Sequence, residues 1–175
     1  MLMKIESLTK NYYENKKKVE SIDTVFFIGS SLTLGYGANL IWEYLQCLPF
    51  FQHLQSLPTP KFMLVAALGD VMMMALVYLG TAIATNSAYW FNEKWSLKLV
   101  FLIVCLSIFL AVIVEVLALK TSRWAYTSKN PIIPLIGISI LPIIQMILIN
   151  PIVFYVSKKT AFAFRKFGQP TTEII

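Results

Sequence analysis

The chain has 175 residues, of which 57% are hydrophobic and 14% are charged, and its net charge is +6. This composition excludes an ordinary soluble domain and indicates an integral membrane protein. The positive charge does not predict a nucleic-acid partner, because the basic residues are divided among tails and loops rather than gathered on one soluble domain.

Four apolar runs follow one another along the chain, at residues 25–48, 62–84, 97–119 and 132–156. Each is close to the ~20 residues that a helix needs to cross a membrane, and each is too long for a barrel strand. The runs predict an all-α, polytopic membrane protein with four transmembrane helices in one bundle. The polar residues 1–24 are expected to form a surface helix or a loose tail rather than a cleavable signal, and residues 157–175 a basic tail.

The distribution of Lys and Arg predicts how the helices are oriented. If the N-terminus is cytoplasmic, the inner segments hold eleven of the fifteen basic residues, and the outer loops hold only Lys61, Lys120, Arg123 and Lys129. The positive-inside rule then places both termini in the cytoplasm. We therefore expect a protein of the bacterial inner (cytoplasmic) membrane, with a homo-oligomer left open.

The segments between the runs carry proline and aromatic residues. The first outer loop, residues 49–61, contains three prolines and is expected to be irregular. The inner loop, residues 86–96, is expected to be anchored at the membrane interface by its aromatic side chains Tyr89, Trp90, Phe91 and Trp95. Pro142 is expected to kink or interrupt the fourth run. Cys47 and Cys105 are expected to pack as apolar residues without a disulfide.

Three acidic residues, Glu43, Asp70 and Glu115, lie inside the apolar runs, where an ionised carboxylate that faces lipid is costly. At ~1.5 Å per residue, all three fall ~7 to ~14 Å below the outer membrane boundary, so they share one depth. Beside one certain cation, Arg123, they cannot all stay ionised in a low-dielectric pocket, and at least one is expected to hold a proton near neutrality. These three acids are the predicted catalytic residues.

A polar stripe on the first run supports this convergence. Tyr36, Asn39, Glu43 and Gln46 are spaced by three, four and three residues, so they lie on one helix face. His53 is placed to approach the acids from the first outer loop. The predicted substrate-binding residues are Asn39, Trp42, Gln46, Arg123, Trp124, Tyr126 and Gln145.

These residues predict an intramembrane enzyme that uses acid–base chemistry on a lipophilic substrate. A desolvated carboxylic acid protonates an alkene or epoxide while other carboxylates and aromatic faces stabilise the developing cation, so neither a cofactor nor a metal is required. Glu115 or Asp70 would be the acid, and Glu43 the partner base or cation stabiliser. Gln46 and Gln145 would orient these groups. The expected partner is a membrane lipid or another lipophilic small molecule.

Two other functions fit the same residues. Acids inside spans also mark ion pathways, which predicts a proton- or cation-coupled small carrier that acts as a dimer. Acids that pair with cations of another chain would instead indicate a non-enzymatic subunit of a membrane complex. Polar side chains that only tie helices together contribute ~0.6 to 2 kcal/mol each, and for three acids at one depth we favour a functional role over this structural one.

The segment from Glu115 to Gln145 includes the string RWAYTSKNPIIPLIGISILPIIQ. It resembles the membrane-embedded lycopene cyclase and related carotenoid-modifying proteins over about 30 of the 175 residues, with Glu115, Trp124, Tyr126 and Pro142 matching. The resemblance implies a cofactor-independent cyclase, isomerase or hydratase of an isoprenoid or carotenoid-like substrate. Gln145 stands near the paired glutamates of that family, and an amide does not donate a proton as an acid does. WEYLQ and GD in the first half are similar to small bacterial integral membrane proteins.

Overall fold

The computed structural model describes residues 2–54 and 59–168, and four long helices make up most of it. Their bounds are α1 Leu2–Phe50, α2 Pro60–Ala84, α3 Leu97–Lys120 and α4 Leu141–Gly168. Each contains a stretch long and apolar enough to cross a membrane, namely Val19–Phe50, Pro60–Ala84, Leu97–Lys120 and Leu141–Arg165. Four such helices indicate an integral membrane protein, in agreement with the sequence analysis.

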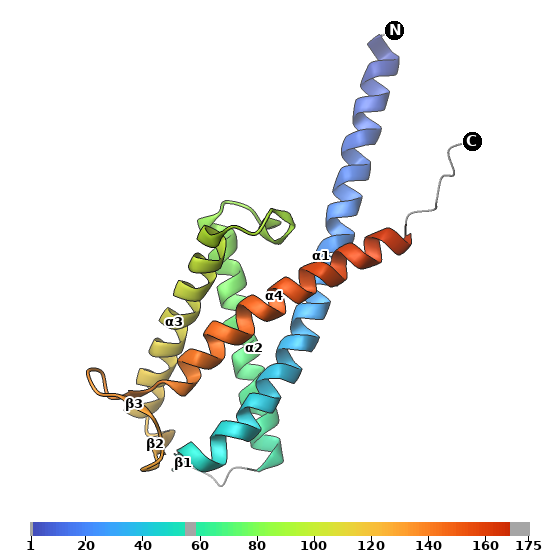
Figure 1. Ribbon diagram of the computed structural model, residues 1–175. Coiled ribbons are helices and arrows are strands. Elements are labelled where there is room, and N and C mark those ends of the chain that lie inside the picture. Colours follow the sequence, from blue (N-terminus) through green and yellow to red (C-terminus); the bar gives the residue numbers. More distant parts are fainter. Residues whose placement is uncertain (1, 55–58, 169–175) are drawn as a thin grey trace.

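The four helices form a bundle in which α1 and α3 lie diagonally opposite each other (Figure 1). α1 packs against α2 and α4, and α3 packs against the same two helices. α1 begins and α4 ends on the same side of the bundle, as a chain that crosses a membrane four times requires. The assignment of that side to the cytoplasm stays a prediction.

The polar N-terminal segment and the first span belong to one helix. α1 is continuous across residue 24, and its first part extends beyond the other three helices (Figure 1). No Gly or Pro occurs between residues 2 and 28, so the sequence contains no helix-breaking residue in this stretch.

α2 and α3 begin at capped positions. The Thr59 hydroxyl oxygen accepts a hydrogen bond from the Phe62 N–H at 3.2 Å, and the Ser96 hydroxyl oxygen accepts one from the Leu99 N–H at 3.2 Å. Pro60 occupies the start of α2, where a missing N–H breaks no helical hydrogen bond. These signals explain why the second and third spans begin close to their predicted positions.

The fourth span, predicted at residues 132–156, begins later than expected. Its first part forms an antiparallel hairpin of β3 (Ile132–Ile133) and β4 (Ile138–Ser139), and α4 starts only at Leu141. Gly137 lies in the turn of this hairpin with φ +67°, a left-handed conformation that favours glycine. An apolar composition alone therefore misassigned the start of this helix.

The kink predicted at Pro142 is also wrong. Pro142 is the second residue of α4, and the first N–H groups of a helix have no partner within the helix. Its ring therefore starts the helix instead of interrupting it. The proline inside α4 is Pro151.

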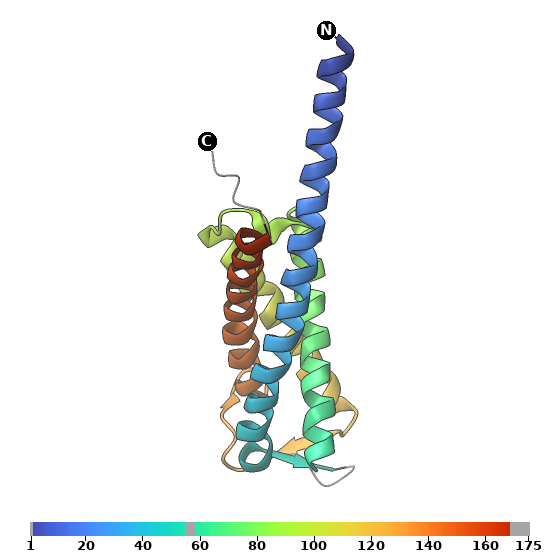
Figure 2. The same ribbon diagram turned by 90° about the vertical axis from the view of Figure 1, so that its right-hand side faces the viewer.

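Two short strands from different loops pair at one end of the bundle. β1 (Phe51–His53) is antiparallel to β2 (Trp124–Tyr126), and their register sets His53 opposite Trp124. The loop at residues 49–61, predicted to be irregular, thus contains a strand. The all-α prediction becomes a mostly helical fold with four short strands among the described residues. We call the end that holds β1 to β4 the strand end (Figure 2).

An aromatic cluster fills the opposite end of the bundle. Trp90 and Phe91, in the 3-10 helix Trp90–Asn92, are fully buried, and Phe91 stacks on Phe27 with ring centroids 4.0 Å apart. Phe154 packs against Trp90 with ring centroids 5.5 Å apart. The predicted anchoring role is wrong for Trp90 and Phe91, because both rings pack inside the protein. Tyr89 of the same loop is exposed.

An ion pair that the sequence analysis did not predict joins α1 to α4 near this aromatic end. Asp23 is 1% exposed, and Arg165 donates two hydrogen bonds to its carboxylate, the one from Nε to Oδ1 measuring 3.2 Å. The sequence placed both residues in polar tails, and a partner 142 positions away leaves no local signal. The pair connects the beginning of the first span to the end of the fourth.

Gly35 on α1 faces Met74 on α2 at close range. A Cβ atom at residue 35 would lie 2.5 Å from Met74 Cε and 2.9 Å from its Sδ, whereas one at Gly37 would meet nothing within 4 Å. Gly35→Leu should therefore lower the free energy of unfolding by about 1–3 kcal/mol relative to Gly37→Leu. Unfolding of the purified protein in mixed micelles measures the difference. Equal stability of the two variants, or no recovery when Met74→Ala is added to Gly35→Leu, would contradict this packing.

Candidate functional site

A cavity of about 370 Å³ lies at the strand end of the bundle. Its walls come from α1, α2, α3, the start of α4 and the strands β1 and β2. Glu43, Asp70 and Glu115 all line it, although they come from three different helices. The structure therefore brings together the three acids that the sequence analysis grouped by depth, and their catalytic role stays a prediction.

The predicted substrate-binding residues divide into two groups. Those that line the cavity are Gln46, Arg123, Trp124 and Gln145. Asn39, Trp42 and Tyr126 are not among the lining residues, and each hydrogen-bonds to a residue that is. The geometry gives these three a positioning role, while direct contact with a substrate stays a prediction.

Glu43 and Asp70 form a carboxyl pair across the interface of α1 and α2. They line the same cavity from neighbouring helices, close enough for their carboxyl groups to hydrogen-bond when one of them is protonated. An ionised carboxylate only accepts hydrogen bonds, so two carboxyl groups can bond to each other only if one of them carries a proton. A proton held between the two carboxyl groups would lie at the cavity wall.

Gln145 on α4 hydrogen-bonds to the Asp70 carboxyl group of this pair. Its Nε2 donates to Asp70 Oδ2 at 2.8 Å and to Asn39 Oδ1 at 2.9 Å. Gln145 is 2% exposed and Asn39 is fully buried, so neither amide has water as an alternative partner. Three helices are thus fixed in register around one amide group.

Gln46 on α1 holds the Glu43 side in the same way. Its Nε2 donates to Glu43 Oε1 at 2.7 Å and to Gln145 Oε1 at 3.3 Å. The indole Nε1 of Trp42 donates to Gln46 Oε1 at 2.8 Å, which fixes the orientation of the amide. Each carboxyl group of the pair therefore accepts a hydrogen bond from a fixed amide.

Glu115 on α3 has a different environment. Its Oε1 accepts a short hydrogen bond from the Tyr126 hydroxyl and a longer one from Trp124 Nε1 at 3.4 Å. The Tyr126 oxygen in turn accepts a hydrogen bond from the Ser139 N–H at 2.9 Å. Burial raises the pKa of Tyr126, and the hydrogen bond to Glu115 raises it further, so the phenol stays protonated and keeps donating. Two donors aimed at one oxygen suit an ionised carboxylate.

Two further side chains line the cavity wall: Cys47, which was expected to pack as an apolar residue, and His53, which was expected to approach the acids from its loop. Cys47 Sγ lies 2.7 Å from His53 Nε2, and both residues line the cavity. The pairing of β1 with β2 brings His53 to this position. No short-range sequence pattern predicts that pairing. Burial lowers the pKa of His53, and the positive charge of Arg123 lowers it further.

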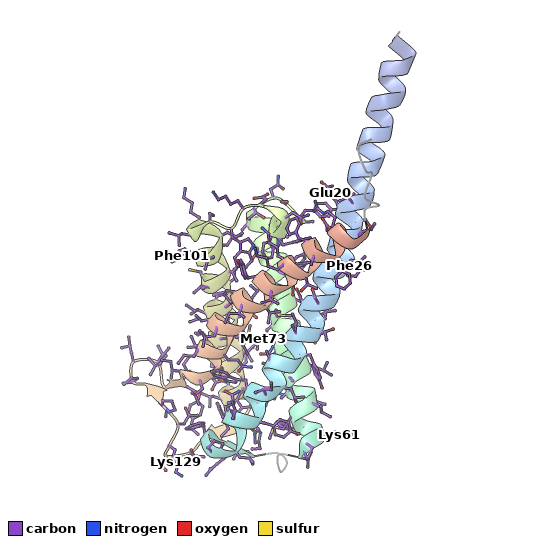
Figure 3. The ribbon with its side chains drawn as sticks, turned by 45° about the vertical axis from the view of Figure 1, so that its right-hand side comes forward. Glu20, Phe26, Lys61, Met73, Phe101 and Lys129 are labelled. Carbon is purple, nitrogen blue, oxygen red and sulfur yellow. The ribbon has the colours of Figure 1, made fainter. Side chains whose placement is uncertain are left out.

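The loops at the strand end contain cations and no acidic residue. Lys61 and Lys129 project from this end of the bundle (Figure 3). Arg123 is exposed and lies with its guanidinium carbon 5.4 Å from the centroid of the Trp124 ring. At this end of the bundle the acidic side chains therefore line the cavity, while Lys61 and Lys129 lie outside it.

Within residues 2–54 and 59–168, no three His, Cys, Asp or Glu side chains are arranged to hold a metal ion. The polar groups available to a bound molecule are the carboxyl, amide, imidazole, thiol, indole and guanidinium groups that line the cavity.

No protein-family model, curated protein or solved structure matches the chain. The resemblance of residues 115–145 to lycopene cyclase therefore stays a prediction from sequence.

His53 is the only histidine in the sequence, so its imidazole gives a single set of signals in NMR spectra of a labelled sample. Because its pKa is lowered in the folded state, its ring should titrate below the ordinary value of about 6.5. The unfolded chain then binds this proton more readily. The free energy of unfolding should therefore fall as the pH drops from about 6.5 through the folded pKa.

Arg123→Gln should raise the pKa of His53 only in part, because burial is the larger cause of the shift. Lys129→Gln, at the same end of the protein but outside the cavity, is the control. A titration at or above the ordinary value in the wild-type protein would show that His53 is not in the described position.

The hydrogen bond between Tyr126 and Glu115 can be tested with a double-mutant cycle. Tyr126→Phe removes the donor and also leaves the Ser139 N–H without its acceptor, so it should cost about 1–3 kcal/mol of unfolding free energy. The loss should be smaller in the background of Glu115→Leu, which removes the acceptor, with a coupling of about 0.5–3 kcal/mol. Tyr44→Phe, at an exposed position on α1, serves as the control. Strictly additive losses would show that the two side chains do not interact.

Proposed function

We propose that this protein is an integral membrane enzyme that uses buried carboxyl groups for acid–base chemistry on a lipophilic substrate. The observation that carries the proposal is one cavity lined both by two neighbouring carboxyl groups, Glu43 and Asp70, and by a third, Glu115, that is held by different donors. Carboxyl groups in contrasting environments are the means by which one site supplies both an acid and a base.

The Glu43–Asp70 pair and Glu115 take different steps of the proposed reaction. The carboxyl pair donates its proton to an alkene or epoxide, and one positive charge develops on the substrate. Glu115, held by Tyr126 and Trp124, stabilises that charge and then removes a proton from a neighbouring carbon. The substrate gains one proton and loses one, so the net reaction is an isomerisation or cyclisation. The proton on Glu115 returns to the carboxyl pair through solvent.

The walls between these polar groups suit a lipophilic molecule. Phe51, Phe62, Val65, Met72 and Met73 contribute apolar surface to the cavity. Its volume of about 370 Å³ lies in the lower part of the range of small-molecule sites, ~300–1,000 Å³. The cavity therefore accommodates the reacting part of a long lipid rather than the whole molecule, and an isoprenoid substrate stays a proposal.

A proton- or cation-coupled carrier is the second candidate, because a shared proton in a membrane cavity is also what exchange with an ion requires. The aromatic cluster of Phe27, Trp90, Phe91 and Phe154 fills the opposite end of the bundle, which favours chemistry at one end over passage through the protein. A partner-binding subunit is less favoured, because all three acids have hydrogen-bond donors within their own chain.

The test compares lipid extracts from cells that express the wild-type protein, Glu115→Gln, or no added protein. Chromatography with mass detection resolves isomers of equal mass. The wild-type protein should convert a lipid species, and Glu115→Gln should lower the rate by about 100-fold or more, because an amide neither accepts the proton nor carries the charge. Glu93→Gln, at an exposed position outside the cavity, is the matched control and should keep full activity.

Folding of each variant is checked by gel filtration and circular dichroism in detergent. Full activity of a folded Glu115→Gln protein would remove Glu115 from the mechanism. Proton flux into liposomes that depends on Asp70, without any change in lipids, would favour the carrier instead.

A further inference from the structure

The cavity interior contains more negative than positive charge. The titratable and charged side chains that line it are Glu43, Asp70, Glu115, Cys47, His53 and Arg123. With one proton between Glu43 and Asp70, that pair would carry one negative charge, and an ionised Glu115, held by the donors Tyr126 and Trp124, would carry a second. Arg123 supplies the opposing positive charge, since His53, with its lowered pKa, is neutral near pH 7. In that state, one negative charge in the cavity has no opposing positive charge.

Arg123 offsets the buried charge only weakly. It is exposed at the mouth of the cavity, where water and salt screen its field. No Asp or Glu among the described side chains lies within 4.0 Å of its guanidinium group. Glu115 is 1% exposed, so its charge acts in a medium of lower dielectric constant. A cation that enters the cavity would therefore be attracted more strongly by the acids than it is repelled by Arg123.

Aromatic rings in the cavity wall add to this attraction. Phe51, Phe62 and Trp124 line the same space as the acids. The rings of Phe51 and Trp124 pack edge to face: their planes are nearly perpendicular, and their centroids are 6.0 Å apart. The negative face of an aromatic ring attracts a cation, most strongly where water is excluded.

The cavity also reaches the side of the bundle along α2. Val65, Gly69 and Met72 follow one another at helical spacing, all three line the cavity, and all three are exposed on the protein surface. Met73, on the adjoining face of α2, lies toward the middle of the bundle (Figure 3). A Cβ atom at Gly69 would meet nothing within 4 Å. An apolar chain can therefore extend from the acids into the surrounding bilayer.

We propose that this cavity binds lipophilic cations, with the cationic group among Glu43, Asp70 and Glu115 and the apolar chain along α2. For the biological ligand this inference rests on the proposed function, because the cation formed by protonating an alkene or epoxide places the same charge at the same position. A stable ammonium group on an apolar chain imitates that cation and needs no reaction in order to bind.

Binding of the cation displaces the shared proton. The positive group stabilises the fully ionised form of Glu43 and Asp70, so the proton leaves to solvent as the ligand enters. The affinity should consequently rise with pH. Nonspecific partitioning of a surfactant into the bilayer releases no such proton.

The test uses the full chain in nanodiscs of phosphatidylcholine, with empty nanodiscs as the background. Three probes of one chain length separate the ligand classes: dodecyltrimethylammonium, dodecanol and dodecanoate. The ammonium should bind about 10-fold or more tightly than dodecanol, and dodecanoate should not bind above background. A pH indicator in weak buffer should detect proton release with the ammonium alone.

Variants then locate the bound cation. Glu115→Gln and Asp70→Asn should each weaken ammonium binding by about 10-fold, while Glu93→Gln should not. Arg123→Gln should leave the affinity unchanged or raise it, because it removes a positive charge. Gly69→Leu should weaken ammonium binding by narrowing the side opening, with Gly29→Leu on α1 as the matched control, since a Cβ atom there also meets nothing within 4 Å.

Equal binding of ammonium and dodecanol, tighter binding of dodecanoate, or weaker ammonium binding in Arg123→Gln would overturn the inference. The binding measurement needs no turnover, so its result is separate from that of the lipid assay. Acid-dependent ammonium binding without lipid conversion would leave this inference standing and defeat the proposed enzyme. Lipid conversion that depends on Glu115, without any preference for the ammonium over dodecanol, would support the proposed enzyme and overturn this inference.

Discussion

The central constraint on this structure is that carboxyl groups inside an apolar helix bundle must have hydrogen-bond partners from their own chain. Desolvating a carboxyl group without such partners costs several kcal/mol. Gln46 and Gln145 supply donors to Glu43 and Asp70, and β2 supplies donors to Glu115. Because these donors sit on α1, α4 and β2, satisfying the acids fixes the register of most of the strand end.

The diagonal placement of α1 and α3 turns these contacts into a site. The carboxyl pair spans α1 and α2, while Glu115 approaches from α3, which does not neighbour α1. The acids therefore line a shared space instead of merging into one hydrogen-bonded cluster. Gln145 ties α4 to the pair, so the wall cannot shift without breaking buried hydrogen bonds. A preorganised cavity of this kind holds charge without reorganising around it.

The sequence predicted the parts of this arrangement that leave a local signal. The spans of α2 and α3 were predicted from their apolar runs, and the caps at Thr59 and Ser96 begin both helices close to the predicted positions. The acids stood out because charge is rare in such runs. The start of α4 was missed because Ile132 and Ile133 are as apolar in a strand as in a helix. The pairing that positions His53, like the carboxyl pair itself, joins distant parts of the chain and has no short-range pattern.

The two ends of the bundle differ in a way that limits how a ligand reaches the acids. At one end, Trp90 and Phe91 fill the interior, and Asp23 and Arg165 tie α1 to α4. Between that end and the cavity, Met74 is 1% exposed, and the end of its side chain packs against Gly35. Access is therefore from the strand end or from the side along α2. A molecule that enters from the bilayer meets apolar surface first and the carboxyl groups last. The site therefore selects ligands that combine an apolar body with a cationic group or a group that accepts a proton.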